Sequence, residues 1–266
     1  MRIIEAVILG AVQGLTEFLP VSSSGHLALL QKIFGLSGEG TQGALLFDTM
    51  VHAGTALAVF VVLWKDIWAL LKKPVQPLAG SLIIATIPAA ATALLFKDRI
   101  EAVFASGLFF GKPFLGAAFL ITSLSLVIAE ALSRKQERAR DHVNVMDAAI
   151  IGCLQAAAII PGVSRSGATL SGALSRGIDR DAAARFSFLL SIPAILGALA
   201  LQAIDLASGK AEAGIGAAPL AAGTLSAAIV GFFSIKLMLK LVRERQLWGF
   251  AVYTGVLGVA TLVLWK

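Results

Sequence analysis

Six long apolar stretches constrain what this chain can fold into more than any other feature of its sequence. Each has roughly the 20 mostly apolar residues that a helix needs to cross a bilayer. They are residues 45–64, 79–96, 114–132, 182–204, 219–241 and 248–265. Only 14% of the 266 residues are charged, well below the roughly 25% of soluble domains. We therefore expect an all-α polytopic integral membrane protein.

Two further segments, 3–34 and 148–175, have a different pattern. Each holds two apolar stretches that are too short to cross a bilayer, separated by a Ser/Gly/Pro-rich break at 20–26 or 161–167. This pattern is typical of a re-entrant helix pair, because irregular backbone at membrane depth must be buried in protein or line a wet cavity. The alternative is two kinked full spans, and the polarity of the breaks argues against it.

The two halves of the chain repeat each other at a spacing of 142 residues. Residues Gly10, Gln13, Ser22, Ser24 and Gly25 recur as Gly152, Gln155, Ser164, Ser166 and Gly167. We therefore expect one membrane domain made of two units, 1–142 and 143–266, each a re-entrant pair plus three spans. Three crossings reverse the chain, so the second unit should be inverted. Inverted repeats with broken helices commonly meet at a binding site near the midplane.

Lysine and arginine are distributed unevenly between the two sides of the expected bundle. The loops 65–73, 134–140 and 240–245 are basic, as is the segment 176–185, and all four are expected on one side. This side should be cytoplasmic, which places both termini outside. The first re-entrant pair then enters from outside and the second from the cytoplasm. Because basic loops explain the net charge of +6, the charge gives no reason to expect nucleic-acid binding.

Two charged residues lie beside the breaks, at the expected depth of the membrane. Glu17 follows Gln13 by four residues, so both point from the same helix face. Arg165 lies inside the second break. Intramembrane charges are costly and usually functional, and a guanidinium matches phosphate oxygens with two hydrogen bonds. A structural Glu17–Arg165 ion pair is an alternative that does not exclude phosphate binding.

Hydroxyl residues and glycines cluster where the second helix of each pair is expected to begin. A helix start offers free N–H groups that serine can cap and that attract anions. The candidate phosphate-binding residues are Ser22, Ser24, Gly25, Ser164, Ser166, Gly167 and Thr169. Capping alone is the simpler explanation for any one serine. Taken together the residues predict an anion site, and phosphate at this depth suggests a lipid-linked phosphate.

The same region offers groups for acid–base chemistry. A serine that attacks phosphate needs a base, and His26 follows the serine cluster directly. Because Glu17 repels phosphate, either a divalent cation such as Mg²⁺ or Ca²⁺ bridges the two, or Glu17 is a general base. Asp48 and His52 form a further i, i+4 pair. We expect this pair and Gln13 to contact the residues that bind the ligand and not the ligand itself.

At these residues the chain resembles a known family. Segment 13–26, Gln-Gly-Leu-Thr-Glu-Phe-Leu-Pro-Val-Ser-Ser-Ser-Gly-His, is similar to the first signature of undecaprenyl-diphosphate phosphatases, also called bacitracin-resistance proteins. Segment 161–169 resembles their second signature. Phe47-Asp48 with 52–55 is similar to a further family stretch, and the resemblance covers essentially the whole chain.

The resemblance implies an enzyme that hydrolyses undecaprenyl diphosphate to undecaprenyl phosphate and inorganic phosphate. Such an enzyme recycles the lipid carrier for peptidoglycan synthesis and confers bacitracin resistance. It implies a place in the bacterial cytoplasmic (inner) membrane, an active site open to the periplasmic or outer face, and dependence on Mg²⁺ or Ca²⁺.

The resemblance also implies roles for single residues. By position, Ser23 is the nucleophile, His26 the acid/base, and Arg165 with Ser164 and Ser166 the phosphate holder. Gln13 stands where the family has Glu or Gln. This leaves Glu17 as the sole carboxylate there and the candidate metal ligand.

A transporter or flippase of a lipid phosphate is the competing hypothesis, because many transporters are also built from inverted repeats with broken helices. Transport would use Arg165 and the helix starts, but it gives no role to Ser23 with His26. A non-catalytic assembly factor would give no reason to place such charges in hydrocarbon. A homodimer is a further expectation, and the sequence leaves open whether the serine or a water attacks the phosphate.

Overall fold

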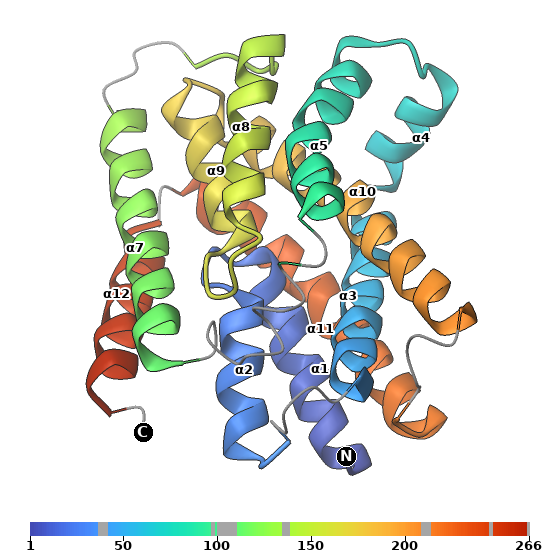
Figure 1. Cartoon of the computed structure of the whole chain (residues 1–266). Helices are drawn as coiled ribbons and strands as arrows, with labels where there is room; N and C mark the ends of the chain where they lie inside the picture. Colours follow the sequence, from blue (N-terminus) through green and yellow to red (C-terminus); the bar gives the residue numbers. More distant parts are fainter. Residues whose placement is uncertain are drawn as a thin grey trace.

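The computed structural model describes residues 1–36, 42–96, 99, 111–134, 139–208, 214–244 and 247–264, which form a bundle of α-helices (Figure 1). Five of these helices are long and apolar enough to cross a membrane: α5 (Pro77–Leu95), α7 (Lys112–Arg134), α10 (Arg180–Ala207), α11 (Ala217–Arg243) and α12 (Leu247–Leu264). A sixth candidate combines α3 (Gln42–Val62) with α4 (Trp64–Lys72). The expected all-α polytopic membrane fold is confirmed.

One expectation about the spans is wrong, because residues 65–73 are not a loop. Residues 65–72 belong to α4, which bends by 79° away from α3 and turns aside at the end of the bundle opposite the two termini (Figure 1). Trp64 and Trp68 of this helix stack with ring centroids 5.4 Å apart. Tryptophan is enriched at membrane–water interfaces. Trp265, expected at the end of the last span, lies outside the described residues.

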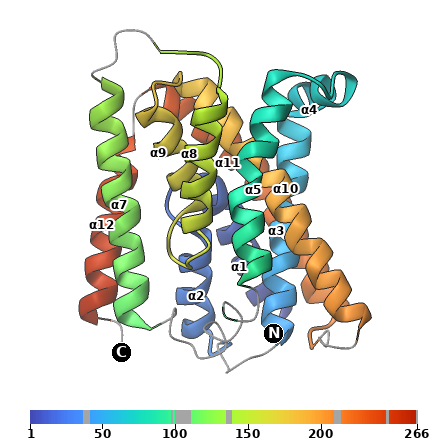
Figure 2. The ribbon, with the colours of Figure 1, turned by 45° about the horizontal axis from the view of Figure 1, so that its top comes forward.

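Two hairpins of shorter helices lie inside the bundle. The first is α1 (Ile3–Phe18) with α2 (Ser23–Ile33), and the second is α8 (Val145–Ala157) with α9 (Arg165–Ser175). The first enters from the end where both termini lie and the second from the opposite end, so that their turns meet at mid-height (Figures 1 and 2). Helix α9 begins and ends 142 residues after α2. The division into units 1–142 and 143–266 stays a prediction.

Small residues hold α1 against α11. A Cβ atom on Gly10 would lie 2.1 Å from the carbonyl oxygen of Gly223, and one on Gly14 would lie 2.6 Å from that of Ala227. Helix α3 approaches α11 as closely, at Gly54. Such close backbone contact is how membrane helices associate without a hydrophobic driving force. It fixes the position of α1, which carries Glu17.

Buried carboxylates organise the end of the bundle opposite the termini. Asp147 is fully buried and accepts hydrogen bonds from Arg140 at 2.8 Å and Arg176 at 2.9 Å. Glu130 is likewise buried and pairs with two other arginines, at 3.0 and 2.9 Å. A carboxylate removed from water needs such partners to remain charged. These pairs tie the ends of α7, α8, α9 and α10 together.

Replacing Asp147 by alanine should lower the stability of the bundle, because it leaves two arginines without their shared partner. We expect a loss of about 2–3 kcal/mol, slightly less than for a fully buried pair, and a lower Tm in detergent. Asp141→Ala is the matched control, because the Asp141 side chain is 95% exposed. Equal Tm values for the two variants would contradict the structural role of Asp147.

Candidate active site

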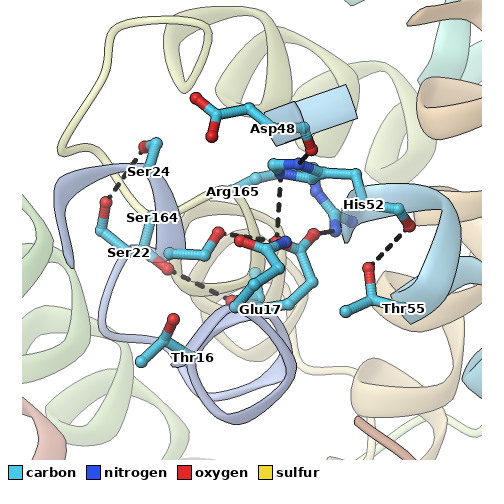
Figure 3. A network of polar contacts seen from close by, with 12 residues as sticks. Thr16, Glu17, Ser22, Ser24, Asp48, His52, Thr55, Ser164 and Arg165 are labelled. Atoms are coloured by element: carbon cyan, nitrogen blue, oxygen red, sulfur yellow. Dashed lines mark hydrogen bonds and ion pairs between the residues drawn. The ribbon is translucent and has the colours of Figure 1, made fainter. Parts of the chain in front are cut away.

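The turns of the two hairpins meet and hold each other. The Ser24 hydroxyl oxygen accepts a hydrogen bond from the Gly162 N–H at 3.2 Å. The Ser166 hydroxyl donates to the Leu19 carbonyl at 3.0 Å. Each break is therefore bound by a serine from the other hairpin, and the polar residues of both breaks converge at one place (Figure 3).

The first serine of each break caps the helix that follows. Ser22 Oγ accepts from the Gly25 N–H at 3.3 Å, and Ser164 Oγ accepts from the Gly167 N–H at 3.0 Å. The backbone N–H groups of both glycines therefore already donate to a serine of their own break. Ser22 has a φ of 72° and is the one non-glycine residue with positive φ in the described part of the chain, so this turn holds a conformation that serine rarely adopts.

Glu17 is the hub of the polar network (Figure 3). It lies in the last turn of α1, and Oε1 accepts a hydrogen bond from Arg165 Nη2 across the two hairpins. Oε2 accepts from Ser23 Oγ at 2.6 Å and from Gln13 Nε2 at 2.9 Å. His52 Nε2 lies 3.5 Å from the same oxygen. The residue is buried, so these partners stabilise its negative charge in place of water.

A cavity of about 330 Å³ opens beside this network. Its polar lining consists of Glu17, Ser22, Ser23, Ser24, Gln31, Asp48, Thr49, His52, Ser164, Arg165 and Ser166. Ala194, Ile195 and Ala198 of α10 form part of an apolar wall. The cavity can therefore hold a molecule that is charged on one side and apolar on the other.

The cavity extends from mid-height toward the end of the bundle that carries both termini. Helices α2 and α3 connect these two levels (Figure 1), and the lining includes Gln31 near the end of α2 and Asp48 near the start of α3. The Gln31 amide donates to Asp48 Oδ1 at 2.7 Å, which joins the two helices there.

Residues 6–260 match the family model of the bacitracin resistance protein BacA. The chain belongs to this family. It is 45% identical over 265 residues to an undecaprenyl-diphosphatase of Carboxydothermus hydrogenoformans, covering 99% of this chain and 98% of that protein. Undecaprenyl-diphosphatases of Methanosphaera stadtmanae and Bacteroides fragilis are each 38% identical over the same shares of the two chains. The family inferred from the two signatures is confirmed.

In this BacA-family protein the two histidines near the site differ from expectation in whether they line the cavity. His26 does not line the cavity. Its Nδ1 lies 2.7 Å from the Ser22 carbonyl oxygen and its Nε2 lies 2.7 Å from the Tyr253 hydroxyl, so both ring nitrogens have partners other than Ser23. His52, expected behind the site, lines the cavity beside Glu17 instead, and so does Asp48.

Three of the expected phosphate-binding residues also lie outside the cavity lining. They are Gly25 and Gly167, whose amides are capped, and Thr169. The Thr169 hydroxyl lies 2.6 Å from that of Ser187 on α10 and bonds the Arg165 carbonyl at 2.9 Å. Thr169 therefore joins α9 to α10. Ser22, Ser24, Ser164 and Ser166 do line the cavity.

Residues on other helices also support the site, and no prediction from the sequence singled them out. Thr122 of α7 accepts a hydrogen bond from the Ser164 N–H at 3.0 Å and so holds the second break. Nothing distinguishes it from the other hydroxyl residues of its span. Gln31 did carry a signal, because an amide interrupts the apolar stretch that follows the first break.

The donor set of the cavity fits a divalent cation only together with a phosphate ligand. No three Asp, Glu, His or Cys side chains converge as a metal site within the described residues. Glu17 and Asp48 are the two carboxylates that line the cavity. Mg²⁺ is commonly bound by one or two carboxylates plus substrate phosphate oxygens and water. This pattern fits the residues present better than a preformed protein cage does.

Proposed function

We propose that this protein is an undecaprenyl-diphosphatase, which hydrolyses undecaprenyl diphosphate to undecaprenyl phosphate and inorganic phosphate. It would thereby recycle the lipid carrier for peptidoglycan synthesis and confer bacitracin resistance. The observation that carries the proposal is the pairing of Ser23 Oγ with Glu17 at 2.6 Å beside Arg165. A hydroxyl held by a base is the arrangement of an activated nucleophile, and the substrate is supported by the relatives described above, which are undecaprenyl-diphosphatases.

The cavity suits the two ends of such a substrate. The diphosphate lies against Arg165, whose fork binds phosphate oxygens, and against the hydroxyls of Ser24, Ser164 and Ser166. The first part of the isoprenoid chain lies along the apolar wall of α10. Because the phosphate competes with Glu17 for the guanidinium, substrate binding frees Glu17 to take a proton.

In the proposed reaction Ser23 Oγ attacks the terminal phosphorus while its proton passes to Glu17. The bond to the bridging oxygen breaks and undecaprenyl phosphate leaves. Water then attacks the phosphoserine, the serine oxygen takes its proton back from Glu17, and His52 accepts the proton of the water. Direct attack by a water that Glu17 activates is the alternative, and it leaves no phosphoserine.

We propose that Mg²⁺ or Ca²⁺ binds together with the diphosphate. Before the proton transfer Glu17 is the expected protein ligand. Once Glu17 takes the proton, Asp48, the second carboxylate of the cavity, would hold the cation. The cation would neutralise negative charge on the phosphate oxygens.

The transporter or flippase hypothesis is not favoured by the site. Moving a lipid phosphate gives no role to a serine hydroxyl bound to a buried carboxylate. The relatives compared above are named as diphosphatases.

We further propose that the protein lies in the bacterial cytoplasmic membrane with the cavity open to the periplasmic or outer face. Helix α4, which carries Lys65 and Lys72, lies at the end of the bundle opposite the termini, and α7 ends there at Arg134 (Figure 1). Basic residues mark the cytoplasmic side, and the cavity extends toward the other end. A homodimer stays a prediction.

Glu17→Gln should reduce phosphate release from undecaprenyl diphosphate by about 10²–10⁴-fold, the usual contribution of a general base. A chelator should abolish release by the native protein. Both are measured on purified protein in detergent. Asp141→Asn, which alters an exposed carboxylate outside the cavity lining, is the control and should stay near native. No release by well-folded native protein would favour transport, which flux of the same lipid in liposomes would then measure.

Ser23→Ala should abolish the phosphoenzyme that acid quenching traps during turnover of substrate carrying a labelled terminal phosphate. The control is Ser208→Ala, whose hydroxyl donates to the Asp205 carbonyl in an exposed position outside the cavity lining; it should still form the phosphoenzyme. A full hydrolysis rate in Ser23→Ala would show that water is the nucleophile.

The orientation can be tested with single cysteines after Cys153, the only cysteine of the chain, is replaced by serine. Lys32→Cys should react with an impermeant thiol reagent applied to intact cells. Lys73→Cys should react only after permeabilisation. The reverse pattern would overturn the topology. Lys97, also expected outside, lies beyond the described residues.

A further inference from the structure

Tyr253, the only tyrosine of the chain, reaches the first break from the last span. Its hydroxyl lies 2.7 Å from His26 Nε2. The two rings stack with centroids 5.7 Å apart and an angle of 12° between their planes. The Phe119 and His26 rings pack in a T-shaped arrangement with their centroids 5.7 Å apart. Aromatic rings from α12 and α7 therefore fix the plane of the imidazole.

The hydrogen bonds of His26 define which nitrogen carries the proton. A carbonyl oxygen only accepts, so Nδ1 must donate to the Ser22 carbonyl at 2.7 Å. In the neutral ring Nε2 is then an acceptor, and the Tyr253 hydroxyl donates to it. Tyr253 thus stabilises the one neutral tautomer that can bind Ser22.

His26 in turn holds the strained turn that precedes Ser23. The Ser22 carbonyl accepts from the His26 side chain and also from the His26 backbone N–H at 3.2 Å. Ser22 has positive φ, and such a conformation persists only where its surroundings hold it. The direction of the next residue, Ser23, toward Glu17 depends on this turn.

Helix α12 is itself fixed in place. Ser123 of α7 donates to the Ala251 carbonyl at 2.7 Å, two residues from Tyr253. Lower in the same helix pair, a Cβ on Gly258 would lie 2.9 Å from the Gly116 carbonyl oxygen. The close α7–α12 packing therefore sets the height at which the Tyr253 hydroxyl meets His26.

We propose that Tyr253 is a positioning residue of the active site, which acts through His26 to hold the Ser22 turn and thereby orient Ser23. The proposal rests on the phosphatase function above. It makes His26 a structural donor and not a proton carrier in the reaction. The chemistry agrees, because the leaving group is a phosphate monoester that can depart as an anion without a nearby acid.

The first test separates the two roles of His26. In His26→Asn the amide N–H takes the place of Nδ1–H and can still bind the Ser22 carbonyl, but it cannot exchange protons. We expect kcat within about tenfold of native, the scale of one hydrogen bond, and a much larger loss in His26→Ala. An acid/base residue would lose about 10²–10⁴-fold in both variants, and equal losses of that size would overturn the proposal.

The second test removes only the hydroxyl of Tyr253. We expect Tyr253→Phe to lower kcat by about three- to tenfold with KM within about twofold of native. In a His26→Asn background the same change should have almost no effect, because the Asn side chain is too short to place an acceptor where Nε2 meets the hydroxyl. Val256→Ala is the control, since Val256 is an exposed residue of the same helix. A native kcat in Tyr253→Phe, or the same loss in both backgrounds, would contradict the proposal.

A spectroscopic test needs no activity. Biosynthetic 3-fluorotyrosine labels one site, because the chain has one tyrosine, and gives one ¹⁹F resonance in detergent. This resonance should move in His26→Asn and His26→Ala and stay in place in Val256→Ala. An unmoved resonance in both His26 variants would show that the contact is absent. A native protein that shows the expected ¹⁹F behaviour but releases no phosphate would leave the contact intact and refute only the phosphatase function.

Discussion

The ion pair between Glu17 and Arg165 is the interaction on which the arrangement of the bundle depends. Each charge is carried into the membrane by a different hairpin, and the hairpins enter from opposite ends. A charge at that depth is costly unless it is paired, so the two turns must meet. At the spacing of 142 residues, the positions matching this pair hold Ile159 and Ser23. The repeat is therefore broken at the residues that make the site, and the carboxylate–guanidinium pair is not duplicated.

Much of this arrangement could be predicted from local patterns in the sequence. The spans follow from the length of the apolar stretches, and the hairpins follow from polar breaks that lipid would not tolerate. The Glu17–Arg165 contact was predictable for the same reason, since each charge needed a partner. The second helix of each hairpin begins inside the polar break and not after it, because Ser22 and Ser164 cap helices that begin at the next residue.

The rest depended on the rotation of helices about their axes, which composition does not reveal. His26 and His52 both bond the carbonyl four residues earlier, so they look alike locally. Packing of α2 against Phe119 and Tyr253 turns His26 away from the cavity, whereas α3 turns His52 into it. Asp147 and Glu130 lie near helix ends, where a carboxylate is commonly solvated. Both are buried because arginines distant in sequence cover them, and such pairs leave no local signal.

The mutual support of the two breaks has a consequence for biogenesis. Ser24 binds the Gly162 backbone and Ser166 binds that of Leu19, so each turn is complete only when the other is present. During synthesis the first hairpin emerges well over a hundred residues before Arg165. Until then Glu17 has no cationic partner from the second hairpin. The first hairpin therefore gains the partners of its turn only once the second hairpin is in place.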